Sequence, residues 1–113
     1  MKDYGKDLQE LNESNGRLFK KCPDVGASFM KMHDAAIKDK TLNTKTKELI
    51  ALGISICIRC EGCIISHVDS AVKHGATMDD ISETVDVAIM MGGGPSVAYG
   101  GKAIDFAIQL LEK

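Results

Sequence analysis

Residues 49–58 read LIALGISICI and form the longest apolar run in the chain, with Ser55 as its one polar side chain. A helix that has no polar face is normally buried on every side. The β-branched residues would also suit a strand, but the segment TKTKEL at 44–49 leads into the run, and no second strand is apparent to pair with it. We therefore predict a helix here, shielded by neighbouring helices or by another subunit.

Much of the remaining chain also has helical periodicity. Apolar residues recur there at spacings of three and four, and turn or capping residues such as Gly, Pro, Asn and Thr separate the segments. The predicted helices cover residues 6–21, 23–37 and 44–58; after a break at 59–62, a fourth runs to 74, a fifth covers 78–91 and a last segment ends at 111. We expect one compact all-α domain over residues 1–113, a bundle of about five to six helices.

The composition agrees with a helical bundle and excludes some classes of function. Of the 113 residues, 44% are hydrophobic but only 4% are aromatic, which predicts an aliphatic core with the six methionines as filler. The 14 basic and 16 acidic residues give a net charge of −2. This balance provides no basic surface for nucleic acid or an anionic membrane, so we expect neither as a partner.

The ends of the chain and its cysteines bear on the compartment. The N-terminus reads MKDYGKD, without the apolar segment of a secretory signal, and no run approaches the ~18 apolar residues that span a bilayer. We therefore expect a cytoplasmic protein, in which thiols are kept reduced. Three of the four cysteines lie within seven residues, which favours redox, metal or cluster chemistry over a structural disulfide framework.

The cysteine segment, residues 57–67, reads CIRCEGCIISH. If Cys60 begins a helix, the spacings of three to Cys63 and four more to His67 place all three on one face. Cys63 would then lie in the first turn, where free backbone N–H groups and the helix dipole favour a thiolate. Such a thiolate is a nucleophile, and a second cysteine three residues away can capture its sulfenic acid or mixed disulfide.

Other interpretations of these cysteines remain open. Cys57, Cys60, Cys63 and His67 form a C-x2-C-x2-C-x3-H set of possible zinc ligands, and the cysteines also resemble part of an iron–sulfur run with Cys22-Pro as the distant member. Structural zinc, however, normally takes its ligand pairs from separated segments. The pair could also be an unreactive buried pair, and His67 alone could be an ordinary core or surface histidine.

Two further features have simpler explanations beside the functional ones. Glu48 falls in the predicted first turn of its helix, where an acidic side chain can serve only the helix dipole. The glycines at 92–94 lack the Lys-Ser/Thr that follows in a phosphate-binding loop. We expect these glycines to connect two helices or to allow a close helix crossing.

The combined pattern resembles the alkyl hydroperoxidase D branch of the carboxymuconolactone decarboxylase superfamily. The pattern is Glu48, eleven residues, Cys60-Glu-Gly-Cys63, three residues and then His67. The similarity extends over about residues 20–110 and includes the apolar helix and the glycine break near Gly92. It implies an all-α fold, assembly into homotrimers or hexamers, and reactive cysteines near the subunit contacts.

The resemblance also implies roles for the residues. Cys63 would attack a peroxide, Cys60 would resolve it into a disulfide, and His67 and Glu48 would relay protons to activate Cys63. A lipoyl-bearing or thioredoxin-like dithiol protein would reduce the pair, with neither a cofactor nor a metal required. The expected function is thus a thiol-dependent hydroperoxidase or disulfide oxidoreductase.

One residue departs from the family pattern, and two alternatives stay open. Peroxidases of this type often carry a histidine directly before the second cysteine, where this chain has Gly62; the adjacent Glu61 should point elsewhere and not replace it. The superfamily name suggests a lyase, although decarboxylation needs acid–base groups rather than a dithiol. A metal-binding module is the other alternative, and a role for Cys57 is left undecided.

Overall fold

The computed structural model describes residues 1–112, which form six α-helices and no strand. In chain order the helices are α1 (Tyr4–Lys21), α2 (Pro23–Ile37), α3 (Thr44–Cys57), α4 (Glu61–Lys73), α5 (Met78–Gly92) and α6 (Gly94–Leu111). The predicted all-α fold is therefore confirmed, with boundaries close to those expected. Within residues 1–112, no helix combines the length and the apolar content that crossing a membrane requires.

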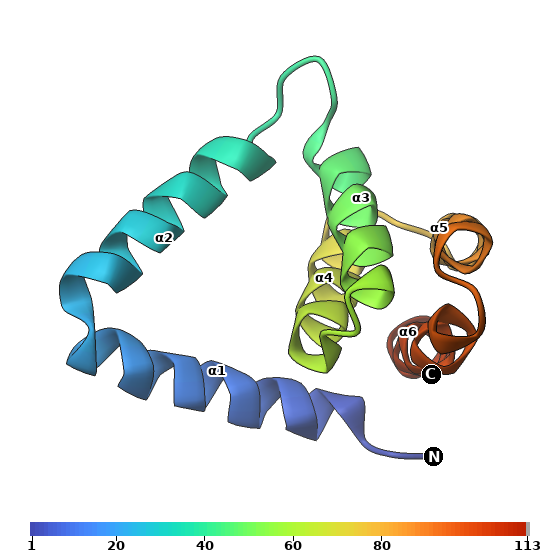
Figure 1. Ribbon diagram of the computed structural model, residues 1–113, viewed down its shortest axis with the longest axis horizontal. Coiled ribbons are helices and arrows are strands. Elements are labelled where there is room, and N and C mark those ends of the chain that lie inside the picture. The colour runs from blue at the N-terminus through green and yellow to red at the C-terminus, as the bar shows by residue number, and fades with distance from the viewer. Residues whose placement is uncertain (113) are drawn as a thin grey trace.

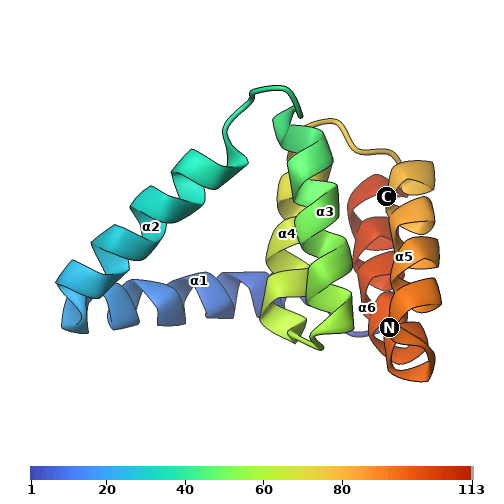
Figure 2. The same ribbon diagram turned by 45° about the horizontal axis from the view of Figure 1, so that its top comes forward.

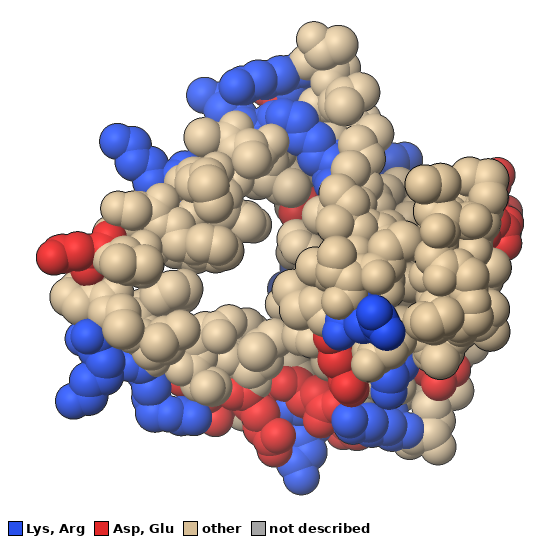
Figure 3. Space-filling view, viewed as in Figure 1, with Lys and Arg blue, Asp and Glu red and all other residues tan. Residues whose placement is uncertain are grey.

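Helices α3 to α6 form a four-helix body, and α1 and α2 form an arm beside it (Figures 1 and 2). In the body, α3 packs against α4 and α5, and α6 packs against the same two helices from the other side. The arm is V-shaped: α1 crosses one end of the body and α2 leans back toward the start of α3. An opening passes between the arm and the body (Figure 3).

The core is aliphatic and lies where the four helices of the body meet. Its fully buried large side chains are Leu52, Ile56, Ile64, Val68, Ile81 and Phe106. Burial of each such side chain contributes about 1.5–3 kcal/mol. Tyr4 is also buried and its ring lies 6.0 Å from that of Phe106, which joins the start of α1 to α6.

The helices of this chain do not by themselves shield α3 on every side. Ile50 and Ile54 are 48% and 56% exposed while Leu52 is fully buried, because the neighbouring helices leave one side of α3 open. Cover of that side by another subunit stays a prediction. The expectation that the methionines fill the core is wrong for most of them: Met78 packs against the core, but Met90 and Met91 are more than 70% exposed on α5.

Short polar and glycine signals set the helix ends as predicted. Asn43 caps α3 by accepting a hydrogen bond from the Thr46 amide at 2.8 Å. Gly93 connects α5 to α6 with φ +70°, a left-handed conformation that favours glycine. A Cβ at Gly92 would lie only 2.0 Å from Ser96 Oγ, so this glycine allows a close crossing of the two chain segments.

Candidate redox site

The turn between α3 and α4 positions Cys60 and Cys63. Arg59 adopts φ +61°, and its amide donates to the Ile56 carbonyl while the Cys60 amide donates to the Ser55 carbonyl. This is a Schellman closure, which normally places glycine in the left-handed position. The tight closure lets α4 start at Glu61, only four residues after the end of α3.

Cys60 is the N-cap of α4 rather than its first residue. Its Sγ accepts a hydrogen bond from the Cys63 amide at 3.2 Å, and the two cysteines form a disulfide with a Cα–Cα distance of 5.2 Å. The break between the helices spans 58–60 instead of 59–62, because Glu61 and Gly62 already belong to α4. Cys63 lies in the first turn, as expected.

Glu48 and His67 are paired across the interface of α3 and α4. The Glu48 side chain is 3% exposed, and its Oε2 lies 3.1 Å from Nδ1 of His67, whose side chain is 22% exposed. Glu48 stands beyond the first turn of α3, which starts at Thr44, so the dipole explanation is wrong. A buried carboxyl group needs a hydrogen-bond partner, and His67 supplies it.

The contact involves Nδ1 of His67 and leaves Nε2 without a contact to Glu48. When Glu48 is ionised its carboxylate only accepts hydrogen bonds, and Nδ1 is then the donor. Because His67 follows Cys63 by four residues in α4, the two side chains share one helical face.

The residues between the two cysteines have different surroundings. Gly62 faces α1, and a Cβ added there would lie 3.4 Å from Leu11 Cδ2. Glu61 points away from the histidine, as expected, because its Oε1 lies 3.2 Å from Lys2 Nζ and 3.8 Å from Lys102 Nζ.

The remaining cysteines lie apart from this pair. Cys57 Sγ turns toward α5, where it lies 3.5 Å from the Ala88 carbonyl oxygen, and Cys22 is exposed at the start of α2. Across residues 1–112, no three His, Cys, Asp or Glu side chains are arranged so that they could hold a metal ion. The proposed zinc set of Cys57, Cys60, Cys63 and His67 is therefore not assembled.

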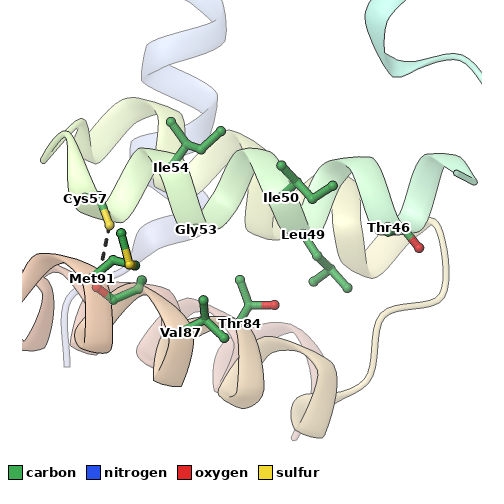
Figure 4. A pocket seen from close by; sticks show the side chains of 10 residues that line it. Thr46, Leu49, Ile50, Gly53, Ile54, Cys57, Thr84, Val87 and Met91 are labelled. Atoms are coloured by element: carbon green, nitrogen blue, oxygen red, sulfur yellow. Dashed lines mark hydrogen bonds between the residues drawn. The ribbon is translucent and has the colours of Figure 1, made fainter.

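An apolar groove between α3 and α5 is the feature that the sequence reasoning missed (Figure 4). It has a volume of about 510 Å³ and lies between Leu49, Ile54 and Cys57 on one side and Val87 and Met91 on the other. The apolar run at 49–58 was the available signal, but periodicity did not indicate which of its sides would stay uncovered. Glu48 faces α4 instead, so the groove and the Glu48–His67 pair lie on different sides of α3.

Comparisons with known proteins agree with this fold. The sequence model of the Carboxymuconolactone decarboxylase family matches residues 23–105, and the chain belongs to this family. The match confirms the resemblance found in the sequence. A relative from Cupriavidus necator, described as uncharacterised, is 33% identical over 99 residues and 88% of each chain. Another, an uncharacterised protein of the cox locus of Paracoccus denitrificans, is 34% identical over 86% of this chain and 87% of its own.

Solved structures of the family have the same fold. A family protein from Legionella pneumophila superposes with a TM-score of 0.90, at 34% identity and 97% coverage of both chains. A family protein from Thermotoga maritima superposes with a TM-score of 0.80, at 29% identity and 89% coverage of both chains. The Thermotoga protein is described as a candidate for involvement in the antioxidative response.

Proposed function

We propose that this protein is a thiol-dependent hydroperoxidase or disulfide oxidoreductase that cycles Cys60 and Cys63 between dithiol and disulfide. The observation that carries the proposal is the disulfide at the start of α4, together with His67 one turn further along, which is paired with the buried Glu48 of α3. The antioxidative description of the Thermotoga relative supports the same chemistry.

In the oxidative half of the cycle, Cys63 is the nucleophile. Its thiolate attacks the terminal oxygen of a hydroperoxide, an S–O bond forms, the O–O bond breaks, and the alcohol leaves with a proton that His67 delivers. Cys60 then attacks the sulfenic acid sulfur, so that the disulfide forms and water leaves. Glu48 keeps the His67 ring oriented through the contact between its Oε2 and His67 Nδ1.

In the reductive half, a protein dithiol of the lipoyl or thioredoxin type restores the pair. One partner thiolate attacks the disulfide to give a mixed disulfide, and the second partner thiol releases the reduced cysteines and becomes oxidised. This exchange needs a reducing compartment, so we place the cycle in the cytoplasm.

Gly62 bears on the choice between peroxide and disulfide substrates. Gly62 offers no side chain to the relay, and a Cβ there would make only ordinary van der Waals contact with Leu11 Cδ2, at 3.4 Å. The relay therefore consists of Glu48 and His67 alone, which favours disulfide exchange as the second candidate activity. A lyase reaction makes no use of the dithiol, and the metal-binding alternative lacks an assembled ligand set.

The first test is turnover of cumene hydroperoxide with dithiothreitol as the reductant, on protein checked for metal content. We expect turnover by the wild type, its loss in Cys63→Ser, and no change in the control Cys22→Ser, whose thiol is exposed outside the site. Reversible formation of the disulfide without peroxide turnover would restrict the function to disulfide exchange. A pair that never forms a disulfide would refute both activities.

A second test assigns the roles of the two cysteines. In Cys60→Ser, peroxide should leave a sulfenic acid on Cys63 that a dimedone-type reagent traps, because the resolving thiol is gone. Trapping on Cys60 in Cys63→Ser, with none on Cys63 in Cys60→Ser, would mean that the roles are reversed.

A further inference from the structure

Glu61 lies between the two cysteines and is held by two lysines from distant parts of the chain. Lys2 precedes α1 and Lys102 belongs to α6, and their Nζ atoms lie 3.2 Å and 3.8 Å from Glu61 Oε1. We call Glu61, Lys2 and Lys102 the Glu61 cluster.

The stability of the fold does not explain this cluster well. All three side chains are about one third exposed or more, and exposed ion pairs of this kind contribute little to the free energy of unfolding. Tyr4 and Gln109 already tie the start of the chain to α6, since Gln109 Oε1 accepts from the Tyr4 amide at 3.1 Å. The position of the cluster, directly beside the disulfide, is the feature that needs an explanation.

Charge near a thiol pair changes its redox equilibrium. Reduction converts a neutral disulfide into two thiols, and one of them becomes a negatively charged thiolate where its surroundings favour that charge. An unpaired Glu61 carboxylate in the first turn of α4 would oppose the negative charge of a Cys63 thiolate. Lys2 is shared between two carboxylates, since its Nζ lies 3.0 Å from Asp7 Oδ2 and 3.2 Å from Glu61 Oε1. Hydrogen bonds to Asp7 and then to Glu61 raise the pKa of Lys2, so it stays cationic and, with Lys102, offsets part of the Glu61 charge.

We propose that Lys2 and Lys102 are positioning residues that act through Glu61 to favour the reduced, thiolate form of the Cys60–Cys63 pair. This inference rests on the proposed redox cycle and names residues that set the equilibrium between the disulfide and the dithiol. The lysines neutralise Glu61 and direct its carboxylate away from Cys63, which makes the disulfide easier to reduce.

The test is the redox equilibrium of the pair with glutathione at pH 8 and low salt. Two glutathione molecules reduce the protein disulfide with two electrons and form one glutathione disulfide. Their two protons pass to the protein thiols, and one of these protons is released to solvent when Cys63 is a thiolate. Alkylation followed by peptide mass analysis gives the fraction of Cys60–Cys63 disulfide separately from Cys22 and Cys57. The variants are Lys2→Ala, Lys102→Ala, their double variant and Glu61→Gln, with Lys73→Ala as control.

We expect the double lysine variant to shift the equilibrium constant about two- to fivefold toward the disulfide, and each single variant to shift it less. Glu61→Gln should shift it toward the dithiol, because the lysines then remain without the carboxylate. The shifts should largely vanish in 1 M NaCl, where the screening length falls to about 3 Å. Lys73→Ala should have no effect, since Lys73 pairs with Asp69, near the far end of α4.

Three results would overturn the inference. If the lysine variants behave like Lys73→Ala, the cluster has no effect on the pair. If Glu61→Gln shifts the equilibrium in the same direction as the lysine variants, the ion pairs act by holding the start of α4 in place and not through the charge beside the cysteines. If the wild-type pair does not exchange with glutathione, the redox cycle itself fails with the inference. If the protein exchanges with glutathione but does not turn over peroxide, the inference is still decided by the glutathione equilibrium of the variants.

Discussion

Cys60 ends one helix and begins the next. Its amide donates a hydrogen bond to the Ser55 carbonyl at the C-terminus of α3. Its sulfur accepts a hydrogen bond from the Cys63 amide at the N-terminus of α4 and also forms the disulfide with Cys63. The backbone of this turn therefore brings the two cysteines to the 5.2 Å Cα separation that a disulfide requires. A pair held in this way can close without rearrangement of either helix.

Arg59, directly before Cys60, gives the first prediction at this scale. Its φ of +61° is unfavourable for an L-residue and suits glycine. We expect Arg59→Gly to raise the free energy of unfolding by about 0.5–1 kcal/mol, and Arg59→Val to lower it by about 1–2 kcal/mol, because β-branched residues tolerate positive φ least. Urea denaturation checks both. A clear loss of stability in Arg59→Gly would show that the arginine side chain contributes contacts.

The Glu48–His67 pair gives the second prediction. Glu48→Gln keeps the size of the side chain but removes the charge that orients and stabilises the His67 ring. Alkylation of Cys63 at pH 7 should then slow by about tenfold, because a smaller fraction of Cys63 is thiolate and a tenfold change corresponds to about one pKa unit. Glu83→Gln, an exposed change on α5, is the control. Equal rates in the three proteins, after reduction of the disulfide, would remove Glu48 from the relay.

At the scale of the elements, the capping box of α5 gives a third prediction. The Thr77 hydroxyl oxygen accepts from the Asp80 amide at 3.1 Å, and the Asp80 carboxylate accepts from the Thr77 amide at 2.9 Å. Thr77→Ala should lower the free energy of unfolding by about 1 kcal/mol, whereas Thr77→Ser, which keeps the hydroxyl, should leave it nearly unchanged. Urea denaturation at pH 7 separates the two. An equal loss in both variants would contradict a capping role.

The same capping box gives a fourth prediction, on pH. The hydrogen bond from the Thr77 amide, together with Lys45, holds the pKa of Asp80 below its ordinary value. A lowered pKa in the folded state stabilises the fold above the unfolded pKa of about 3.9, and this contribution is lost as pH falls through the folded pKa. Wild type should therefore exceed Asp80→Asn in stability at pH 7, and the difference should shrink below about pH 4. A difference independent of pH would contradict this assignment.

The helices were predictable from sequence because their ends carry local signals. Asn43, Thr77 and the glycine at 93 act within one turn of the chain, so a sequence pattern is sufficient to place them. The burial of α3 was not predictable, because Ile54 looks the same in sequence whether a neighbouring helix covers it or not. The contact between Glu48 and His67 joins two helices, and only the family resemblance, not the spacing, indicated it.

At the scale of the whole molecule, the uncovered apolar surface gives a fifth prediction. Ile50 and Ile54 on α3 and Val87 and Met91 on α5 line the groove between the two helices, and each is between 48% and 74% exposed. Patches of this kind on soluble proteins mark interaction sites. We propose that this surface is buried in a homo-oligomer, which we expect to be a trimer or hexamer.

Ile54→Glu places a charge in that surface and should convert the assembly into smaller species. Analytical ultracentrifugation measures the change, which we expect to weaken association at least tenfold because an unpaired charge would be buried. Lys73→Glu, an equally drastic change on the exposed end of α4, should leave the assembly intact. A wild type that is monomeric at high concentration would refute the proposal.

The V-shaped arm has a consequence for local opening of the fold. Helix α2 contacts mainly α1 and the start of α3, so separating it from the body exposes little apolar surface compared with global unfolding. In a free protomer the amide hydrogens of α2 should therefore exchange with solvent through such partial openings, well before those of α4. If a neighbouring copy occupies the space beside the arm, exchange in α2 will slow as protein concentration rises, whereas exchange in α4 will not.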